Sequence, residues 1–253
     1  MTARPRRSVL ACAIFAASVT GALAGCSSSD TPLTPTTAAS ATTTAAVPPT
    51  GVKPASTPES ERTLFDAVDR NDPAAVTAAL TAGANIEARG EGERTPLVEA
   101  TKNNAVAAAS TLILAGADVN AKDSMQDSAF LYSGAEGLNE ILALTLSYGA
   151  DVDSVNRYGG TALIPASEHA HVETVRMLIA AGVPVNHVND PGWTALLEAV
   201  VYGDGSARYV DVITQLLDAG ADPSIRDASG KTALDNAESR GQSEVVALLQ
   251  SRS

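Results

Sequence analysis

Cysteine is nearly absent from this chain. The 253 residues contain two, Cys12 and Cys26, and none follows. The body of the chain therefore has no disulfide framework, no thiolate zinc site and no cysteine nucleophile. A body without thiols also suits an oxidising compartment, because nothing in it can form a wrong disulfide.

Aromatic residues and positive charges are scarce as well. Aromatic residues make up 4% of the chain and apolar residues 45%, which predicts a core of small side chains on closely packed helices. The formal net charge is −12 at pH 7. Nucleic-acid-binding proteins normally present a basic face, so this balance argues against nucleic acid as a partner.

The beginning of the chain has the pattern of an export signal. A basic start containing Arg6 and Arg7 precedes an uncharged, apolar stretch, residues 8–22. This stretch is too short for a transmembrane helix and has no stop-transfer pattern after it. The arginine pair leaves both general secretion and twin-arginine export open.

The apolar stretch is followed by Leu23-Ala24-Gly25-Cys26. This motif resembles the lipobox of bacterial lipoproteins. The resemblance implies a signal peptide at residues 1–25 and a diacylglyceryl thioether on Cys26, which would anchor the chain to a cell membrane outside the cytoplasm. An ordinary secretory peptide with an incidental cysteine is the alternative.

A low-complexity segment comes next. Residues 27–58 contain 9 Thr, 6 Pro, 6 Ala and 5 Ser, with Asp30 and Lys53 as the only charges. Such a composition cannot bury enough apolar surface to offset chain entropy. We therefore expect residues 26–58 to be a lipidated cysteine and a disordered tether.

The rest of the chain repeats with a period of 33 residues. Two independent markers, a glycine in Ala-Gly-Ala-like strings and a Thr/Ser-x-Leu-like triplet, both recur at spacings of 33, 33, 33 and 38. The glycines are Gly83, Gly116, Gly149, Gly182 and Gly220, and the triplets begin at Thr95, Ser128, Thr161, Thr194 and Thr232. Two markers that keep one register indicate a repeat architecture.

Each repeat has the same local pattern. The Thr or Ser is a helix N-cap, a short helix with small residues follows, and a polar turn leads to a second, more apolar helix. Residues 172–179 are such a helix, which Gly182 would end. Five extra residues near positions 203–207 would lengthen one turn between helices.

This pattern resembles the ankyrin repeat family. The resemblance implies an all-α repeat solenoid over residues 59–253, with about six units including caps, each a helix-turn-helix plus a β-turn finger. The third unit departs most from the pattern, since Gln126 replaces the finger glycine and polar Thr145 lies in an apolar helix. We expect that unit to be the least stable.

The sequence contains no catalytic constellation, so we predict no enzyme activity and no cofactor. His169 and His171, with Glu168 nearby, could suggest a metal site, but a structural role in the turn between helices is the preferred interpretation. His187 lies in a finger and is expected to be solvated. An enzyme or metal carrier is the alternative from another functional class.

The resemblance also implies where a partner binds. Ankyrin domains use the concave surface formed by the fingers and first helices, and counting from the triplets places 32 positions of this chain there. The predicted partner-binding residues are Arg89, Arg94, Lys102, Lys122, Met125, Arg157, Tyr158, His169, Trp193, Tyr202, Arg226 and Lys231.

These positions hold nine of the 13 Lys and Arg residues found after residue 60. A negative protein would thus turn a mildly positive face toward a partner with an acidic surface. Trp193, the only tryptophan, is either a binding anchor or packed locally on Pro191 and Tyr158.

The sequence therefore predicts a membrane-tethered, extracytoplasmic module that binds another protein, with no nucleic acid and no small-molecule substrate. The alternative within the binding class is an inhibitor or immunity partner of a secreted enzyme. A scaffold of this kind does not identify its partner.

Overall fold

The computed structural model describes residues 55–252, and the regular elements within that range are helices. The predicted signal peptide, Cys26 and nearly all of the predicted tether lie outside the described residues. The α-helices are α1 (Pro58–Asp69), α2 (Pro73–Thr81), α3 (Pro96–Lys102), α4 (Val106–Leu114), α5 (Ala129–Ala135), α6 (Asn139–Ser147), α7 (Leu163–Glu168), α8 (Val172–Ala180), α9 (Ala195–Val201), α10 (Ala207–Asp218), α11 (Ala233–Ser239) and α12 (Ser243–Gln250). A single 3₁₀ turn, η1 (Glu91–Glu93), precedes α3.

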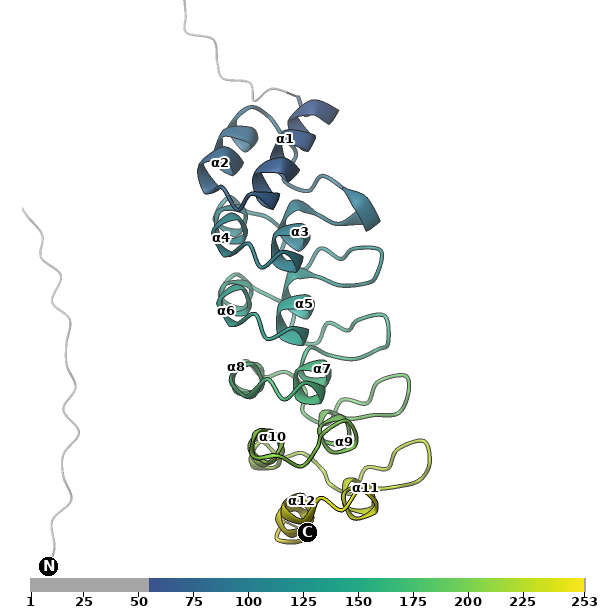
Figure 1. Cartoon of the computed structure of the whole chain (residues 1–253). Coiled ribbons are helices and arrows are strands. Elements are labelled where there is room, and N and C mark those ends of the chain that lie inside the picture. Colours follow the sequence, from purple (N-terminus) through teal and green to yellow (C-terminus); the bar gives the residue numbers. More distant parts are fainter. Residues whose placement is uncertain (1–54, 253) are drawn as a thin grey trace, which may run out of the picture. The chain divides into compact units, whose positions relative to one another are not determined.

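The described helices form six antiparallel pairs that stack in sequence order (Figure 1). Odd-numbered helices make one row and even-numbered helices the other, and each helix packs on the next member of its own row. The loops between pairs project beside the odd-numbered row. This arrangement confirms the predicted all-α repeat solenoid.

The predicted helix caps are present in four of the five marked repeats. The hydroxyls of Thr95, Ser128, Thr194 and Thr232 each accept a hydrogen bond from the backbone N–H three residues later. Such a cap stabilises a helix by about 1 kcal/mol.

Thr161 is the exception, and the prediction of a cap there was wrong. Its buried hydroxyl has no hydrogen-bond partner among the described residues, and α7 begins at Leu163. Pro165 explains the difference, because it has no N–H for the Thr161 carbonyl and disfavours the helical conformation at Ile164. The Ile164 N–H donates to the Thr161 carbonyl instead of the hydroxyl.

The tip of each finger contains a residue in the left-handed conformation. Gly159, Gly192 and Gly230 hold this position in three fingers, with φ between 69° and 88°. Glu93 and Gln126 hold it in the first two, with φ of 58° and 63°. A residue with a Cβ is strained there, so two fingers are less stable locally than their sequence neighbours.

The core is built from small and aliphatic side chains in closely approaching helices. A Cβ added to Gly134 in α5 would lie 2.8 Å from the Cβ of Ala162, which shows how near the helices come. Phe130 is fully buried. Thr145, the polar residue expected to weaken the third unit, is also fully buried, but its hydroxyl donates to the Leu142 carbonyl over 2.9 Å.

The five extra residues of the fifth repeat divide between a turn and a helix. The turn between α9 and α10 covers residues 202–206, whereas the turn between α3 and α4 covers 103–105. The remaining three residues lengthen α10 to 12 residues, compared with 9 in α8. The predicted lengthening of the turn is therefore confirmed, but it takes up only part of the insertion. The longer helix lets the Tyr209 hydroxyl donate to the Glu168 carbonyl over 2.9 Å.

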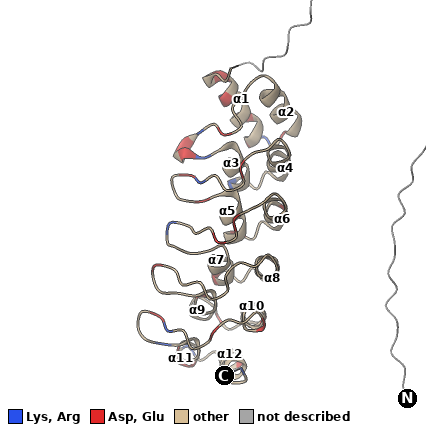
Figure 2. Cartoon of the chain, turned by 180° about the vertical axis from the view of Figure 1, so that it is seen from behind, with Lys and Arg blue, Asp and Glu red and all other residues tan. Residues whose placement is uncertain are grey.

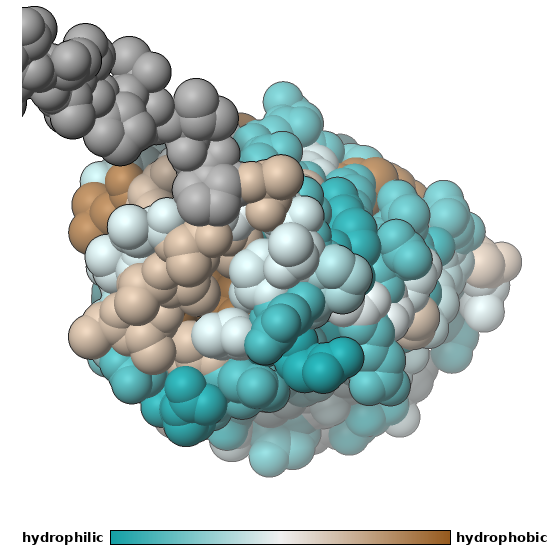
Figure 3. Space-filling model, turned by 90° about the horizontal axis from the view of Figure 1, so that it is seen from above, coloured by the Kyte–Doolittle hydropathy of each residue, from teal (hydrophilic) through white to brown (hydrophobic). Residues whose placement is uncertain are grey.

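The N-terminal end of the stack is closed by α1 and α2. Viewed from that end, weakly apolar residues lie among hydrophilic ones (Figure 3). The exposed residues of α2 include Pro73, Ala74, Thr77 and Ala78, whose small side chains present little apolar surface to solvent. Within residues 55–252, no helix has the length and apolar character needed to span a bilayer.

Candidate partner-binding face

One side of the stack, here named the finger face, combines the fingers and the odd-numbered helices. The fingers are residues 82–95, 115–128, 148–162, 181–194 and 219–232. Acidic and basic residues interleave along them (Figure 2). All of the partner-binding residues predicted from the sequence, except His169 and Tyr202 in turns between helices and Lys102 at the end of α3, lie in these fingers.

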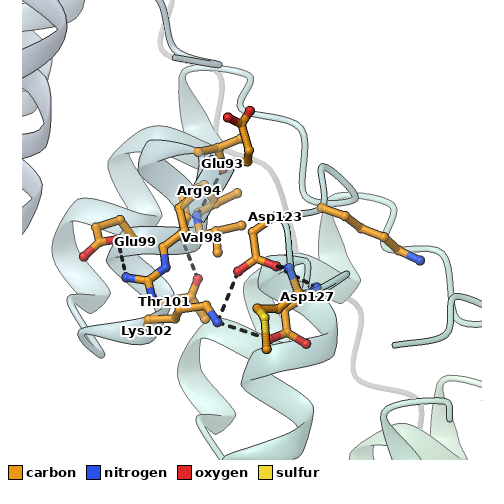
Figure 4. A network of polar contacts seen from close by, with 12 residues as sticks. Glu93, Arg94, Val98, Glu99, Thr101, Lys102, Asp123 and Asp127 are labelled. Carbon is orange, nitrogen blue, oxygen red and sulfur yellow. Dashed lines mark hydrogen bonds and ion pairs between the residues drawn. The ribbon is translucent and has the colours of Figure 1, made fainter. Parts of the chain in front are cut away.

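An ion-pair network covers the finger face around α3 (Figure 4). The Lys102 ammonium lies 3.2 Å from Asp123 and 3.1 Å from Asp127, and 4.4 Å from the centre of the Tyr132 ring. Its side chain is 13% exposed. Arg94 pairs with Glu99 over 3.1 Å, and this hydrogen bond raises the pKa of the arginine. Both cations are already matched by neighbouring carboxylates.

Other predicted cations connect one finger to the next. The Arg89 guanidinium donates to the Lys122 carbonyl over 2.7 Å, and the Lys122 ammonium donates to the Val155 carbonyl over 2.7 Å. Arg226 donates within its own finger, to the Gly230 carbonyl. These cations hold the shape of the fingers, so the freely available positive charge on the face is smaller than the sequence count suggests.

Two of the exposed predicted cations form neither an ion pair nor a hydrogen bond to a carbonyl within residues 55–252, and three large predicted side chains are exposed as well. Arg157 and Lys231 form no ion pair within residues 55–252, although Arg157 lies 4.6 Å from the centre of the Tyr158 ring. Met125, Tyr158 and Tyr202 are 44%, 53% and 57% exposed. The structure thus presents aromatic and thioether side chains to solvent on one face.

Trp193 is half-buried and packs against the core. Its ring centre lies 6.2 Å from that of Tyr202, with the planes tilted by 50°. Local packing is therefore one role of this tryptophan, and the more exposed Tyr202 is the aromatic group that it supports.

A pocket of about 290 Å³ opens beside these aromatic residues. It brings together Tyr158 and Tyr202 with three residues that the sequence analysis did not assign to binding, Glu198, Asn189 and Pro191. Glu198 is only 7% exposed, and its Oε1 accepts a hydrogen bond from the Asn189 amide over 3.2 Å. Burial, reinforced by the negative charge of Glu168, raises the pKa of Glu198 to about 7.

Glu198 could have been found from the sequence. It is a carboxylic acid four residues after Thr194, in a first helix whose other residues are apolar. A lone ionisable residue in such a helix marks either a buried hydrogen bond or a site. The depth of the pocket could not have been found, because finger residues 189 and 191 form one wall of it.

The histidines have structural surroundings. The His171 ring packs on Gly137 in the neighbouring turn, and burial lowers the pKa of His171. His169 is exposed, with its ring 5.6 Å from that of His171. His187 is half-buried and its Nε2 contacts the Gly159 carbonyl, so the expectation that it is solvated was wrong. In the described residues no three His, Cys, Asp or Glu side chains are grouped to hold a metal.

A stack of helix pairs with projecting fingers and an aromatic-lined face defines a helical repeat scaffold for protein binding. The family model for ankyrin repeats in three copies matches residues 130–227, and the single ankyrin repeat model matches residues 92–124. This chain belongs to the ankyrin repeat family. Ankyrin repeats are in general a non-catalytic scaffold for protein–protein interaction.

Solved structures agree with this assignment. The chain is similar to an ankyrin repeat domain from Acinetobacter baumannii, with 52% identity, a TM-score of 0.73, and coverage of 75% of this chain and 96% of the other. A second ankyrin repeat protein of known crystal structure has 39% identity and a TM-score of 0.72, with coverage of 75% and 97%.

Proposed function

We propose that this chain is a protein-binding module, tethered outside the cytoplasm to a cell membrane, and that its finger face receives the partner. The observation that carries the proposal is the exposure of Tyr158 and Tyr202 beside one pocket of that face. Aromatic residues at the centre of an interface typically supply much of its binding energy.

The tether is proposed from the sequence. The lipobox-like motif ending in Cys26 supports a signal peptide at residues 1–25, and the Thr- and Pro-rich composition supports a spacer at residues 26–58 before the repeat domain at 59–253. In an extended polyproline conformation that spacer would reach about 100 Å. It would place the finger face well away from the lipid.

Part of the partner surface is proposed to be acidic. Arg157 and Lys231 are exposed cations of the finger face that form no ion pair within residues 55–252. An acidic patch opposite them would speed association more than it would strengthen the final complex.

Site-specific photocrosslinking of the full-length chain in its native cell envelope tests the proposal. A photoreactive phenylalanine replaces Tyr202 on the finger face or, as the control, Leu114, which is 67% exposed at the end of α4. We expect a discrete crosslinked protein from position 202 alone. Adducts from position 114 alone, equal adducts from both, or none from either would overturn the finger face as the binding surface.

A further inference from the structure

The pocket on the finger face has an unusual distribution of charge. Glu198 lies in the middle of α9, and Glu168 lies at the end of α7, and both line the pocket. Glu198 Oε1 accepts from Asn189, but Oε2 accepts no hydrogen bond from any residue in 55–252. The Glu168 carboxylate has no hydrogen bond or ion pair with any described residue either.

A buried carboxylate with a free oxygen in a pocket destabilises the folded state, because its charge is removed from water without a partner. A less destabilising arrangement is found at the equivalent place of another repeat. In the next repeat, neutral Asn236 occupies the position of Glu198, and it hydrogen-bonds the finger residue Asp227 over 2.9 Å. Helix packing therefore does not require a glutamate at position 198.

We propose that this pocket receives one basic side chain, lysine or arginine, of the partner protein. The proposal rests on the proposed function, since it specifies which chemistry the finger face recognises. The cation would supply the missing partner for Glu198 and Glu168.

The rest of the pocket fits such a side chain. Pro165 and Pro191 offer apolar surface for an aliphatic stem, and the aromatic residues Tyr158 and Tyr202 line the same pocket. A volume of about 290 Å³ is just below the roughly 300–1,000 Å³ found for small-molecule sites. It suits a single side chain better than a cofactor.

The charges around Glu198 leave room for a cation. The group that acts on it electrostatically is Glu168 of α7, and Asn189 of the finger is its hydrogen-bond donor. Neither α10 nor α11, which also pack on α9, contributes a charged group to its titration. Arg157 stacks on Tyr158, and its hydrogen bond with Tyr158 is the main reason why the pKa of Arg157 is raised, with Asp127 and Asp123 adding to the effect.

The single tryptophan makes a direct test possible. Trp193 lies 6.2 Å from the ring of Tyr202, so its fluorescence reports on the pocket. The full-length chain is titrated with capped Gly-Lys-Gly and Gly-Arg-Gly peptides, and with Gly-Gln-Gly as the neutral control, at constant ionic strength. We expect saturable binding of one or both basic peptides with Kd on the order of 1 mM. The two arms distinguish lysine from arginine.

Variants assign the binding to the pocket. Glu198→Gln keeps the shape and the Asn189 hydrogen bond, and Glu168→Gln removes the second charge; each should raise Kd about tenfold. Glu244→Gln, on the exposed surface of α12, makes the same change in net charge and should leave Kd unchanged. Wild-type affinity should also increase from pH 6 to pH 8, as Glu198 loses its proton, whereas Glu198→Gln should show no such increase.

Equal binding of the glutamine peptide, no binding of either basic peptide, or unchanged affinity in both glutamate variants would overturn the proposal. The peptide titration and the crosslinking experiment can fail independently of each other. If position 202 still crosslinks the partner equally well in Glu198→Gln, the finger face binds a protein but the pocket does not select a cation. If the basic peptides bind as expected and no partner crosslinks, the pocket is real and the proposed function is wrong.

Discussion

The Asn189 side-chain amide donates to Glu198 over 3.2 Å, and the next repeat contains the same contact with donor and acceptor exchanged. There the carboxylate, Asp227, lies in the finger and accepts from the Asn236 amide and from two backbone amides. The Asn236 hydrogen bond is the main reason why the pKa of Asp227 is lowered. Both carboxylates are equally buried, at 7% exposure, so moving the carboxylate from the finger to the helix replaces an anion held by three donors with an acid that has one donor and titrates near neutral pH.

The first prediction follows from the raised pKa of Glu198, about 7 in the folded chain against 4.5 for the free side chain. Glu198 binds its proton more tightly in the folded state, and this adds to the free energy of unfolding. The added stability is fully present below about pH 4.5 and is lost as pH rises through about 7. Between pH 5 and pH 8, the free energy of unfolding measured with urea should fall by about 2 kcal/mol more in the wild type than in Glu198→Gln. An equal loss in both proteins would contradict the assignment.

The second prediction concerns the strained fingertip at Gln126, which has φ of 63°. Gln126→Gly should raise the free energy of unfolding by about 0.5–1 kcal/mol, because glycine adopts this conformation without a Cβ clash. Ser124→Gly, two residues away and without positive φ, is the matched control and should lower it. Thermal unfolding followed by circular dichroism distinguishes the two signs.

The third prediction concerns the ion pair between Lys102 and the buried Asp123. Lys102→Met should lower the free energy of unfolding by about 3 kcal/mol, because it leaves an uncompensated buried charge. Adding Asp123→Asn should restore a large part of the lost free energy of unfolding. Asn156 already occupies the equivalent finger position and accepts the same two backbone hydrogen bonds, and Asn189 in the next finger accepts the second of them. If the double variant is no more stable than Lys102→Met, the unpaired Asp123 charge is not the cause of the lost stability.

The fourth prediction tests the proposed tether. Cys26→Ala should prevent lipid attachment, so the chain should leave the membrane fraction or accumulate with its signal peptide uncut. Cell fractionation and the mass of the protein measure both outcomes. Cys12→Ala, which changes the only other cysteine, should remain processed and membrane-bound. A Cys26→Ala protein that behaves like the Cys12 variant would exclude the lipoprotein interpretation.

The fifth prediction addresses the proposed acidic partner. Arg157→Gln with Lys231→Gln should slow association with the crosslinked partner several-fold at low salt and much less above 0.5 M salt, since such charges act over about 10 Å at 0.1 M. Surface plasmon resonance at two ionic strengths measures the rates. Equal rates for variant and wild type at low salt would show that these cations do not steer the partner.

The sequence predicted the fold in detail because its signals are local. Thr95, Ser128, Thr194 and Thr232 cap the helices that they were expected to cap, and the failure at Thr161 has a local cause in Pro165. Residue spacing within one repeat is sufficient to determine such features.

The finger face was less predictable because its contacts connect different repeats. Lys102 meets carboxylates 21 and 25 residues later, and Lys122 donates to a carbonyl 33 residues later. The periodic count placed both residues on the correct side of the stack, but it could not distinguish a cation free for a partner from one already held by the next finger.

The two buried clusters of the core meet within the third helix pair. Neighbouring residues of one helix belong to different clusters: Ala129 packs with the N-terminal cluster and Phe130 with the C-terminal one, and Ile141 and Leu142 divide in the same way. A stack joined only through nearest neighbours carries an axial load through its interfaces in series. In the proposed tethered state, a partner bound beside Tyr202 would load the α5–α6 joint and every other interface between it and α1 equally, so the weakest of these interfaces would set the greatest tension that the folded chain can transmit.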